Sequence, residues 1–302
     1  MFYALRTTHE SMSWQQILGT AVLLAIVILY ACGWRYLRRQ KMSDRPLSLS
    51  GRGYLPCFSF YFGLLLLWLA LFSPLDQWST HYFFVRVMQH LLLIAWIPAT
   101  LLWGRPFAII PFGLPHSLRD KHERWFPSLT ASHSLWFRMT HPGFVLFAFV
   151  ATFWLWYDPV LHGATLNHAW LRPIEKGSLL LTAGLYWWHI TGSAQVFYMP
   201  MPPLIRILYT LFGAGPIKLV GLVLLFTEET IYSYPGTIAF TGLDLTAQSL
   251  GGMIIWAAGG VVFSTTAGGL MRNWLGQEDE KPVLPFSVWS TEESMLAPGT
   301  RK

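Results

Sequence analysis

Residues 17–30 read ILGTAVLLAIVILY and residues 64–72 read LLLLWLALF. These runs have no polar face, and a helix of about 20 apolar residues is long enough to cross the hydrocarbon core of a bilayer. Of the 302 residues, 53% are hydrophobic and 12% are charged, whereas the charged fraction of a soluble domain is about 25%. The composition therefore excludes a water-soluble enzyme, a disordered chain and a disulfide scaffold. It indicates a polytopic membrane protein.

Seven apolar runs of this kind predict an all-α bundle of seven transmembrane helices, because a backbone in hydrocarbon must satisfy its own hydrogen bonds. The runs are residues 14–34, 54–72, 82–103, 142–161, 173–191, 204–226 and 247–271. They divide the chain into an outer segment (1–13), one membrane domain (14–272) and a polar cytoplasmic tail (273–302). The long basic and aromatic loop 104–141 is expected to lie on the inner leaflet as an interfacial segment.

The distribution of positive charge predicts the orientation of this bundle. The net charge is +6, but the Lys and Arg residues lie beside the apolar runs, which favours contact with membrane lipid and not with nucleic acid. Sixteen of them fall in the connections that follow runs one, three, five and seven. On the opposite side, only Arg6 and Arg172 occur. The positive-inside rule therefore puts the N-terminus outside and the C-terminus in the cytoplasm.

Polar residues enter the apolar runs at the predicted outer face, and each is costly to place in a membrane. They are Arg86, Gln89, His90, Arg172, Glu175, Lys176, Asp244 and Gln248. One interpretation is that they lie in the headgroup zone, where long side chains reach water. The other is an outward-facing polar pocket between runs three, five and seven, in which the carboxylates balance the cations.

The last two runs carry two further features. Lys218 lies inside run six, where it either extends to the interface or pairs with an acid such as Glu175. Glycine pairs at 251–252, 259–260 and 268–269 in run seven predict close helix packing.

Several short motifs follow one another along residues 50–275. They are SPLD at 73–76, QHLLL at 89–93, Pro98, GRP at 104–106, HP at 141–142, WW at 187–188, and Gln248 through GG at 251–252 to Trp256. In this order they resemble the bacterial CtaG-type cytochrome c oxidase assembly proteins. The resemblance implies seven helices in the cytoplasmic membrane of a bacterium and no enzymatic activity. It also implies binding of oxidase subunits during maturation of a haem–copper oxidase, with help in delivering copper.

In that family the outer helix ends carry histidines in patterns resembling H-M-x-Q-H, W-H-x-P and H-x-x-E-H. Here His90 and Glu175 match, but three of the histidine positions hold Arg86, Arg172 and Lys176, and the W-H pair reads Trp156-Tyr157. Arginine is always protonated and only donates hydrogen bonds, so it repels a metal ion. The expectation is a charge-paired network with at most a degraded copper site, for which His90 and His168 are the candidate ligands.

Two other classes of function remain open from the sequence. A small-solute or ion transporter, with copper as one such ion, would use the outward-facing pocket and would need polar residues that continue to the inner face. A membrane haem protein would need histidines at matched depth on facing helices, and His90 and His189 lie near opposite ends of their runs. The sequence does not name the client oxidase or the oligomeric state.

Overall fold

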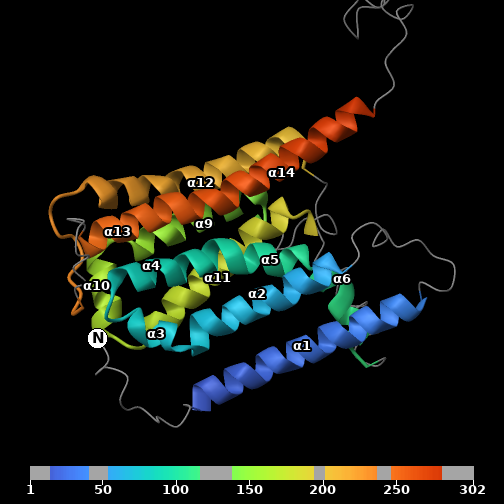
Figure 1. The fold of residues 1–302 in the computed structure, drawn as a ribbon, viewed down its shortest axis with the longest axis horizontal. Coiled ribbons are helices and arrows are strands. Elements are labelled where there is room, and N and C mark those ends of the chain that lie inside the picture. The colour runs from blue at the N-terminus through green and yellow to red at the C-terminus, as the bar shows by residue number, and fades with distance from the viewer. Residues whose placement is uncertain (1–13, 41–53, 116–137, 194–200, 237–245, 281–302) are drawn as a thin grey trace, which may run out of the picture.

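The computed structural model describes residues 14–40, 54–115, 138–193, 201–236 and 246–280, which form helices and turns with no strand among them. The all-α class predicted from the sequence is confirmed for these residues, and the long helices run side by side as a bundle (Figure 1). Two π-helical turns, η2 and η5, and one 3₁₀ turn, η3, continue the helices that precede them. In chain order the elements are α1 (Trp14–Gln40), α2 (Leu55–Phe72), α3 (Pro74–Trp78), α4 (Phe83–Leu91), η2 (Leu92–Trp96), α5 (Ile97–Trp103), α6 (Pro106–Ile109), η3 (Ile110–Gly113), α9 (Pro142–Trp156), α10 (Pro159–Asn167), α11 (Leu171–Ile190), α12 (Pro203–Phe226), α13 (Ala247–Ile254), η5 (Ile255–Gly259) and α14 (Gly260–Asp279).

Among the described residues, five helices are long and apolar enough to cross a membrane. They are Gln16–Arg39, Leu55–Phe72, Phe83–Gly113, Pro203–Phe226 and Ala247–Asp279. The bent pair of α9 and α10 makes a sixth if the two form one span. The chain is thus a multi-pass membrane protein. The remaining predicted run falls on α11, whose charged residues, histidine and tryptophans lower its mean hydropathy, so the number seven stays a prediction.

The predicted helix over residues 142–161 is wrong in one respect, because the chain bends by 66° after Trp156. Asp158 begins the new helix: its Oδ1 accepts hydrogen bonds from the amides of Val160 at 3.0 Å and Leu161 at 3.1 Å. Pro159 occupies the first helical position, where its missing amide proton costs nothing. The bend turns α10 across the end of the bundle that also holds α3 (Figure 1).

The helix α1 packs at the edge of the bundle through two glycines. A Cβ on Gly33 would lie 2.1 Å from the carbonyl oxygen of Ile109, and one on Gly113 would lie 2.0 Å from that of Leu29. Tyr30 is fully buried beside them and donates a hydrogen bond to the carbonyl oxygen of Gly104 at 2.8 Å. The start of the predicted interfacial loop therefore packs against α1, while its residues 116–137 lie outside the described residues.

The helices α12 and α13 approach closely at Gly221 and Gly252. A Cβ on Gly252 would lie 2.6 Å from the carbonyl oxygen of Gly221, whereas Gly268 and Gly269 have no atom within 4 Å of an added Cβ. The packing role predicted for the glycines is confirmed at Gly252 and wrong at the last pair. The helix α14 extends to Asp279, beyond the predicted end at residue 271, and residues 281–302 of the tail lie outside the described residues.

The main apolar core lies between α4, α9, α11, α12 and α14, and it includes the stacked rings of Phe149 and Tyr186. The indole of Trp187 donates a hydrogen bond to the carbonyl oxygen of Ile94 in the π-helical turn η2 at 2.8 Å. This contact holds α11 against the span that contains α4. The core thereby sets the depth and rotation of the two helices that carry the polar residues described next.

Candidate functional site

One face of α4 carries three polar side chains into the interior of the bundle. Arg86, Gln89 and His90 are spaced three and four residues apart, so they share one face of the helix. Their exposed fractions are 3%, 1% and 0%. The headgroup interpretation of these residues does not describe this geometry, since each side chain points into protein.

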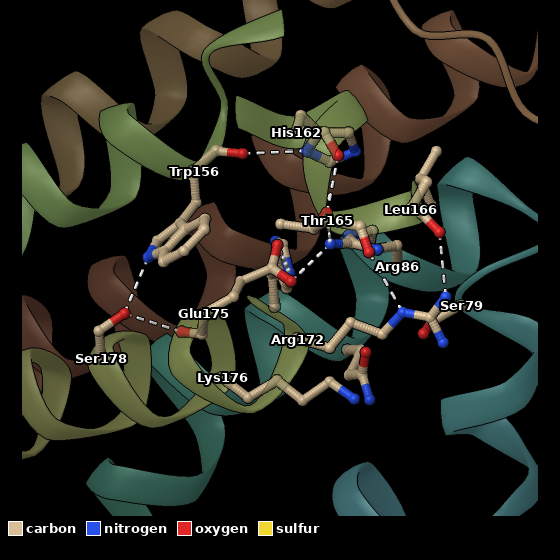
Figure 2. A network of polar contacts seen from close by, with 12 residues as sticks. Ser79, Arg86, Trp156, His162, Thr165, Leu166, Arg172, Glu175, Lys176 and Ser178 are labelled. Atoms are coloured by element: carbon tan, nitrogen blue, oxygen red, sulfur yellow. Dashed lines mark hydrogen bonds and ion pairs between the residues drawn. The ribbon is translucent and has the colours of Figure 1, made fainter. Parts of the chain in front are cut away.

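Arg86 forms a buried ion pair with Glu175 of α11. Its Nη2 donates to Glu175 Oε2 at 2.5 Å and also to the hydroxyl of Thr165 in α10 (Figure 2). The Thr165 hydroxyl in turn donates to the carbonyl oxygen of His162 at 2.7 Å. Glu175 and Thr165 are both 0% exposed. The pair therefore joins α4, α10 and α11 at one end of the bundle, away from water.

His90 lies against the same carboxylate without a well-directed hydrogen bond. Its Nε2 is 3.2 Å from Glu175 Oε1, but the angles of this contact are not those of a hydrogen bond. Its Nδ1 has no partner among the described residues, and its ring meets that of Tyr157 edge-on at 5.6 Å. The Tyr157 hydroxyl and Gln89 Oε1 also lack partners there. These unpaired groups concentrate around Glu175, which marks this region as a site and not as ordinary core.

A second ion pair lies at the edge of the first. Lys176, the residue after Glu175, contacts the carboxylate of Asp76 at the start of α3. Gln89 Nε2 links this pair to α4, because it donates to Asp76 Oδ1 at 2.9 Å and to the carbonyl oxygen of Ala70 at 2.6 Å. The side chains of Lys176 and Asp76 are 13% and 37% exposed. We call Asp76, Arg86, Gln89, His90, Glu175 and Lys176 the charge network.

Arg172 lies beside the charge network and stabilises the end of α10. Its Nε donates to the carbonyl oxygen of Thr165 at 3.2 Å, and its Nη2 donates to that of Leu166 at 3.1 Å (Figure 2). A cation at the carboxyl end of a helix satisfies free carbonyl groups and the helix dipole. Arg172 therefore holds α10 in place above the buried pair.

The remaining predicted site residues are not brought into the charge network. Gln248 is buried at the start of α13, where it accepts a hydrogen bond from the amide of Ile231 at 2.7 Å and donates to the carbonyl oxygen of Glu229 at 3.1 Å. His168 is exposed at the end of α10. Asp244 lies outside the described residues. The structure thus groups Arg86, Gln89, His90, Glu175 and Lys176, places Arg172 next to them, and separates Gln248.

Sequence reasoning did not assign Asp76 or Thr165 to this region, whereas His162 was expected near the outer face on the basis of its position alone. Asp76 belongs to the SPLD motif, and Ser73 in that motif accepts a hydrogen bond from the amide of Leu75 as a helix cap. A capped acidic turn directly after an apolar run was the available signal. Thr165 gave no such signal, because it lies on a helix that the sequence placed partly inside a span and partly in a loop.

His162 borders a hollow of about 300 Å³ between α10 and residues 231–234. Its Nδ1 lies 3.0 Å from the carbonyl oxygen of Trp156, so this nitrogen carries the proton and Nε2 accepts from the Tyr234 hydroxyl at 2.7 Å. The Tyr232 hydroxyl donates to the carbonyl oxygen of Tyr157 at 2.5 Å. Burial, together with the nearby carboxylate of Asp158, raises the pKa of Tyr232 to about 12. Apart from His162, the hollow is lined by side chains of uncharged types.

The residues of the charge network do not fit a copper ion. Copper sites in proteins use imidazole, thiolate and thioether ligands, and the described residues contain no group of three His, Cys, Asp or Glu residues placed to hold a metal. The buried imidazole of His90 has nitrogens without hydrogen-bond partners among the described residues. However, the always positively charged guanidinium of Arg86 binds the Glu175 carboxylate beside it and would repel a copper ion. His168 is exposed while His90 is fully buried, so the two rings do not form one site.

A bundle of apolar helices with buried charged side chains at one end defines a multi-pass membrane protein with a polar site. Residues 28–277 match the family model of the cytochrome c oxidase caa3 assembly factor. The match spans most of the chain, and the chain belongs to this family, as its motifs predicted. It is a family of assembly factors and not of enzymes. No curated protein and no solved structure matches the chain.

Proposed function

We propose that this chain is an integral protein of the bacterial cytoplasmic membrane that binds subunits of a haem–copper cytochrome c oxidase during their assembly. The family match over residues 28–277 is the observation that carries the proposal. The apolar helices support a membrane location, and the charge network at one end of the bundle supports a specialised surface there.

The proposed topology has seven spans, with the N-terminus outside and the C-terminus in the cytoplasm. The helix α11 supports a seventh span, since its 20 residues correspond to about 30 Å of helix and it packs between α5 and α9. The predominance of Lys and Arg in the alternate connections supports the orientation. This topology puts residues 1–13 outside, and puts residues 104–141 and 273–302 on the cytoplasmic side.

The proposed role of the charge network is to shape the outer end of the protein for binding. The buried Arg86–Glu175 pair joins three helices, and the partly exposed Asp76–Lys176 pair lies at the rim. Opposite charges at a rim direct the orientation of a bound partner more than they add affinity. Copper delivery is not part of this proposal, because the network does not offer a copper ligand set.

Deletion of the gene tests the assembly role. Membranes of the deletion strain are expected to lose haem–copper oxidase activity and the absorbance of its haems, and a plasmid with the wild-type gene should restore both. A quinol oxidase without copper is the internal control and should keep its activity. Unchanged levels of every haem–copper oxidase in the deletion strain would contradict the proposal.

A further inference from the structure

Lys218 lies inside α12, which packs against α13, η5 and α14. It is half-buried, and the ion pairs among the described residues do not include it. Of the two alternatives that the sequence left open for Lys218, pairing with Glu175 does not occur, because Glu175 is bound to Arg86 and lies against His90. Lys218 is thus a cation without a carboxylate partner in the described part of the chain.

The amine of Lys218 lies near the middle of the proposed membrane. A Cβ added to Gly260 would lie 3.2 Å from both Cε and Nζ of Lys218, so the amine is beside the backbone of Gly260. At about 1.5 Å per residue, Gly260 is roughly 20 Å along the helix from Ala247 and roughly 18 Å from Arg272. The hydrocarbon core is about 30 Å thick. The side chain therefore does not reach either interface.

The surroundings of this amine face outward. Lys218 Nζ is 5.9 Å from the ring centre of Trp256, which is 48% exposed, and Val261 beside Gly260 is also exposed. The ring stabilises the cation only in part, because its quadrupole carries no net charge. We call Lys218, Trp256 and Val261 the Lys218 face. It also contains the π-helical turn η5, and such turns are frequent at functional sites.

In the described part of the chain, a second copy offers no carboxylate at the depth of Lys218. Glu175 is fully buried, and the other described carboxylates lie at helix ends or in connections. They are Asp76, Asp158, Glu228, Glu229, Glu278, Asp279 and Glu280. Charge complementarity in the middle of a membrane therefore requires a different protein.

We propose that the Lys218 face binds a transmembrane helix of another protein that carries an aspartate or glutamate near the middle of the bilayer. Trp256 and Val261 are exposed beside the amine, so such a helix can approach it, and the carboxylate would remove the cost of an unpaired cation in hydrocarbon. The proposal requires α12 and the span of α13 and α14 to cross the membrane. It does not depend on the assembly role. If the deletion strain kept normal oxidase levels, the crosslinking experiment described next would still decide this proposal.

The test uses the purified full chain in phosphatidylcholine vesicles, with the photoreactive amino acid benzoylphenylalanine at position 261. The probes are biotinylated peptides of about 21 leucines and alanines with Asp, Asn or Leu at the centre. The Asp peptide is expected to crosslink with a roughly fivefold higher yield than the Leu peptide, which corresponds to about 1 kcal/mol. Benzoylphenylalanine at Leu65 is the control and should show no preference. Leu65 is exposed, and its helix α2 lies on the other side of the bundle from α12 and α14 (Figure 1).

Variants of Lys218 separate charge pairing from general packing. Lys218→Met should reduce the yield of the Asp peptide to that of the Leu peptide, while Lys218→Arg should keep the preference. Lys218→Asp should instead prefer a peptide with a central Lys. Equal yields for the Asp and Leu peptides, or an Asp preference that survives in Lys218→Met, would overturn the proposal. Loss of the Asp preference on addition of phosphatidylglycerol would overturn it in favour of a lipid headgroup.

Discussion

At the scale of single residues, burial decides what each polar group contributes. The Arg86–Glu175 pair is inaccessible to water, while the Asp76–Lys176 pair is partly exposed. A buried pair is weak evidence for net stability, but removal of one partner leaves a charge that neither water nor protein compensates. An exposed pair is screened by water and contributes little. Two ion pairs on adjacent residues of α11 should therefore respond very differently to mutation.

Glu175→Gln should destabilise the protein by about 3–5 kcal/mol, because it leaves the Arg86 guanidinium buried without a counter-charge. The double variant Arg86→Met/Glu175→Gln should recover most of this loss. Unfolding in a mild detergent is monitored by circular dichroism. It measures the free energy of unfolding of the wild type, of the single variants Glu175→Gln and Arg86→Met, and of the double variant. If the losses of the two single variants simply added in the double variant, the two groups would not act as a pair.

Asp76→Asn is the matched test of the outer pair and should cost less than about 1 kcal/mol, because water solvates Lys176 once its partner is neutral. The outer pair is expected to matter for function instead. A plasmid carrying Asp76→Lys should therefore restore less oxidase activity to the deletion strain than a plasmid with the wild-type gene. The charge exchange Asp76→Lys/Lys176→Asp should restore part of that activity. Full activity of Asp76→Lys at normal protein levels would show that the rim charge has no role in binding.

At the scale of elements, breaks in the helices place the site. Asp158 and Pro159 end α9 and start α10, and the bend brings the hydroxyl of Thr165 to Arg86. The π-helical turn η2 frees the carbonyl oxygen of Ile94 for the indole of Trp187. Straight helices of the same composition would bury the same apolar surface but would not align α4, α10 and α11 around one carboxylate.

The contact between α12 and α13 gives an element-scale prediction. Gly252→Ala should destabilise the protein by about 1–3 kcal/mol, since its Cβ would lie 2.6 Å from backbone atoms of Gly221 and Leu225 that cannot move aside. Gly268→Ala is the matched control, because no atom lies within 4 Å of its added Cβ, and alanine favours a helix over glycine. The detergent unfolding assay should rank Gly268→Ala above the wild type and Gly252→Ala below it. Equal stability of the two variants would be inconsistent with the close contact.

At the scale of the whole molecule, the proposed topology predicts which residues face each side of the membrane. In a variant with Cys32 and Cys57 replaced by Ser, Ser233→Cys should react with a membrane-impermeant maleimide in intact spheroplasts. Gln277→Cys should react only after the membrane is permeabilised. Both positions are exposed in the structure, so burial does not explain a difference. Labelling of both residues from the outside would contradict the proposal that one span separates Ser233 from Gln277.

The sequence alone determined the membrane class, the all-helical fold and the family, because hydropathy and short motifs are properties of neighbouring residues. It also predicted that Arg86, Gln89 and His90 share a face, since helical spacing decides this. The bend at residues 157–158 contains a typical helix-capping residue, but that residue lies within a long apolar run. The run was therefore predicted as one continuous helix. Only the tertiary structure decided which charges pair: Arg86 and Glu175 are 89 residues apart, and Asp76 and Lys176 are 100 apart. It also showed that Gln248 bonds to the backbone of Glu229 and Ile231, and that no carboxylate in the described residues pairs with Lys218, because partner choice depends on helix packing that no local pattern encodes.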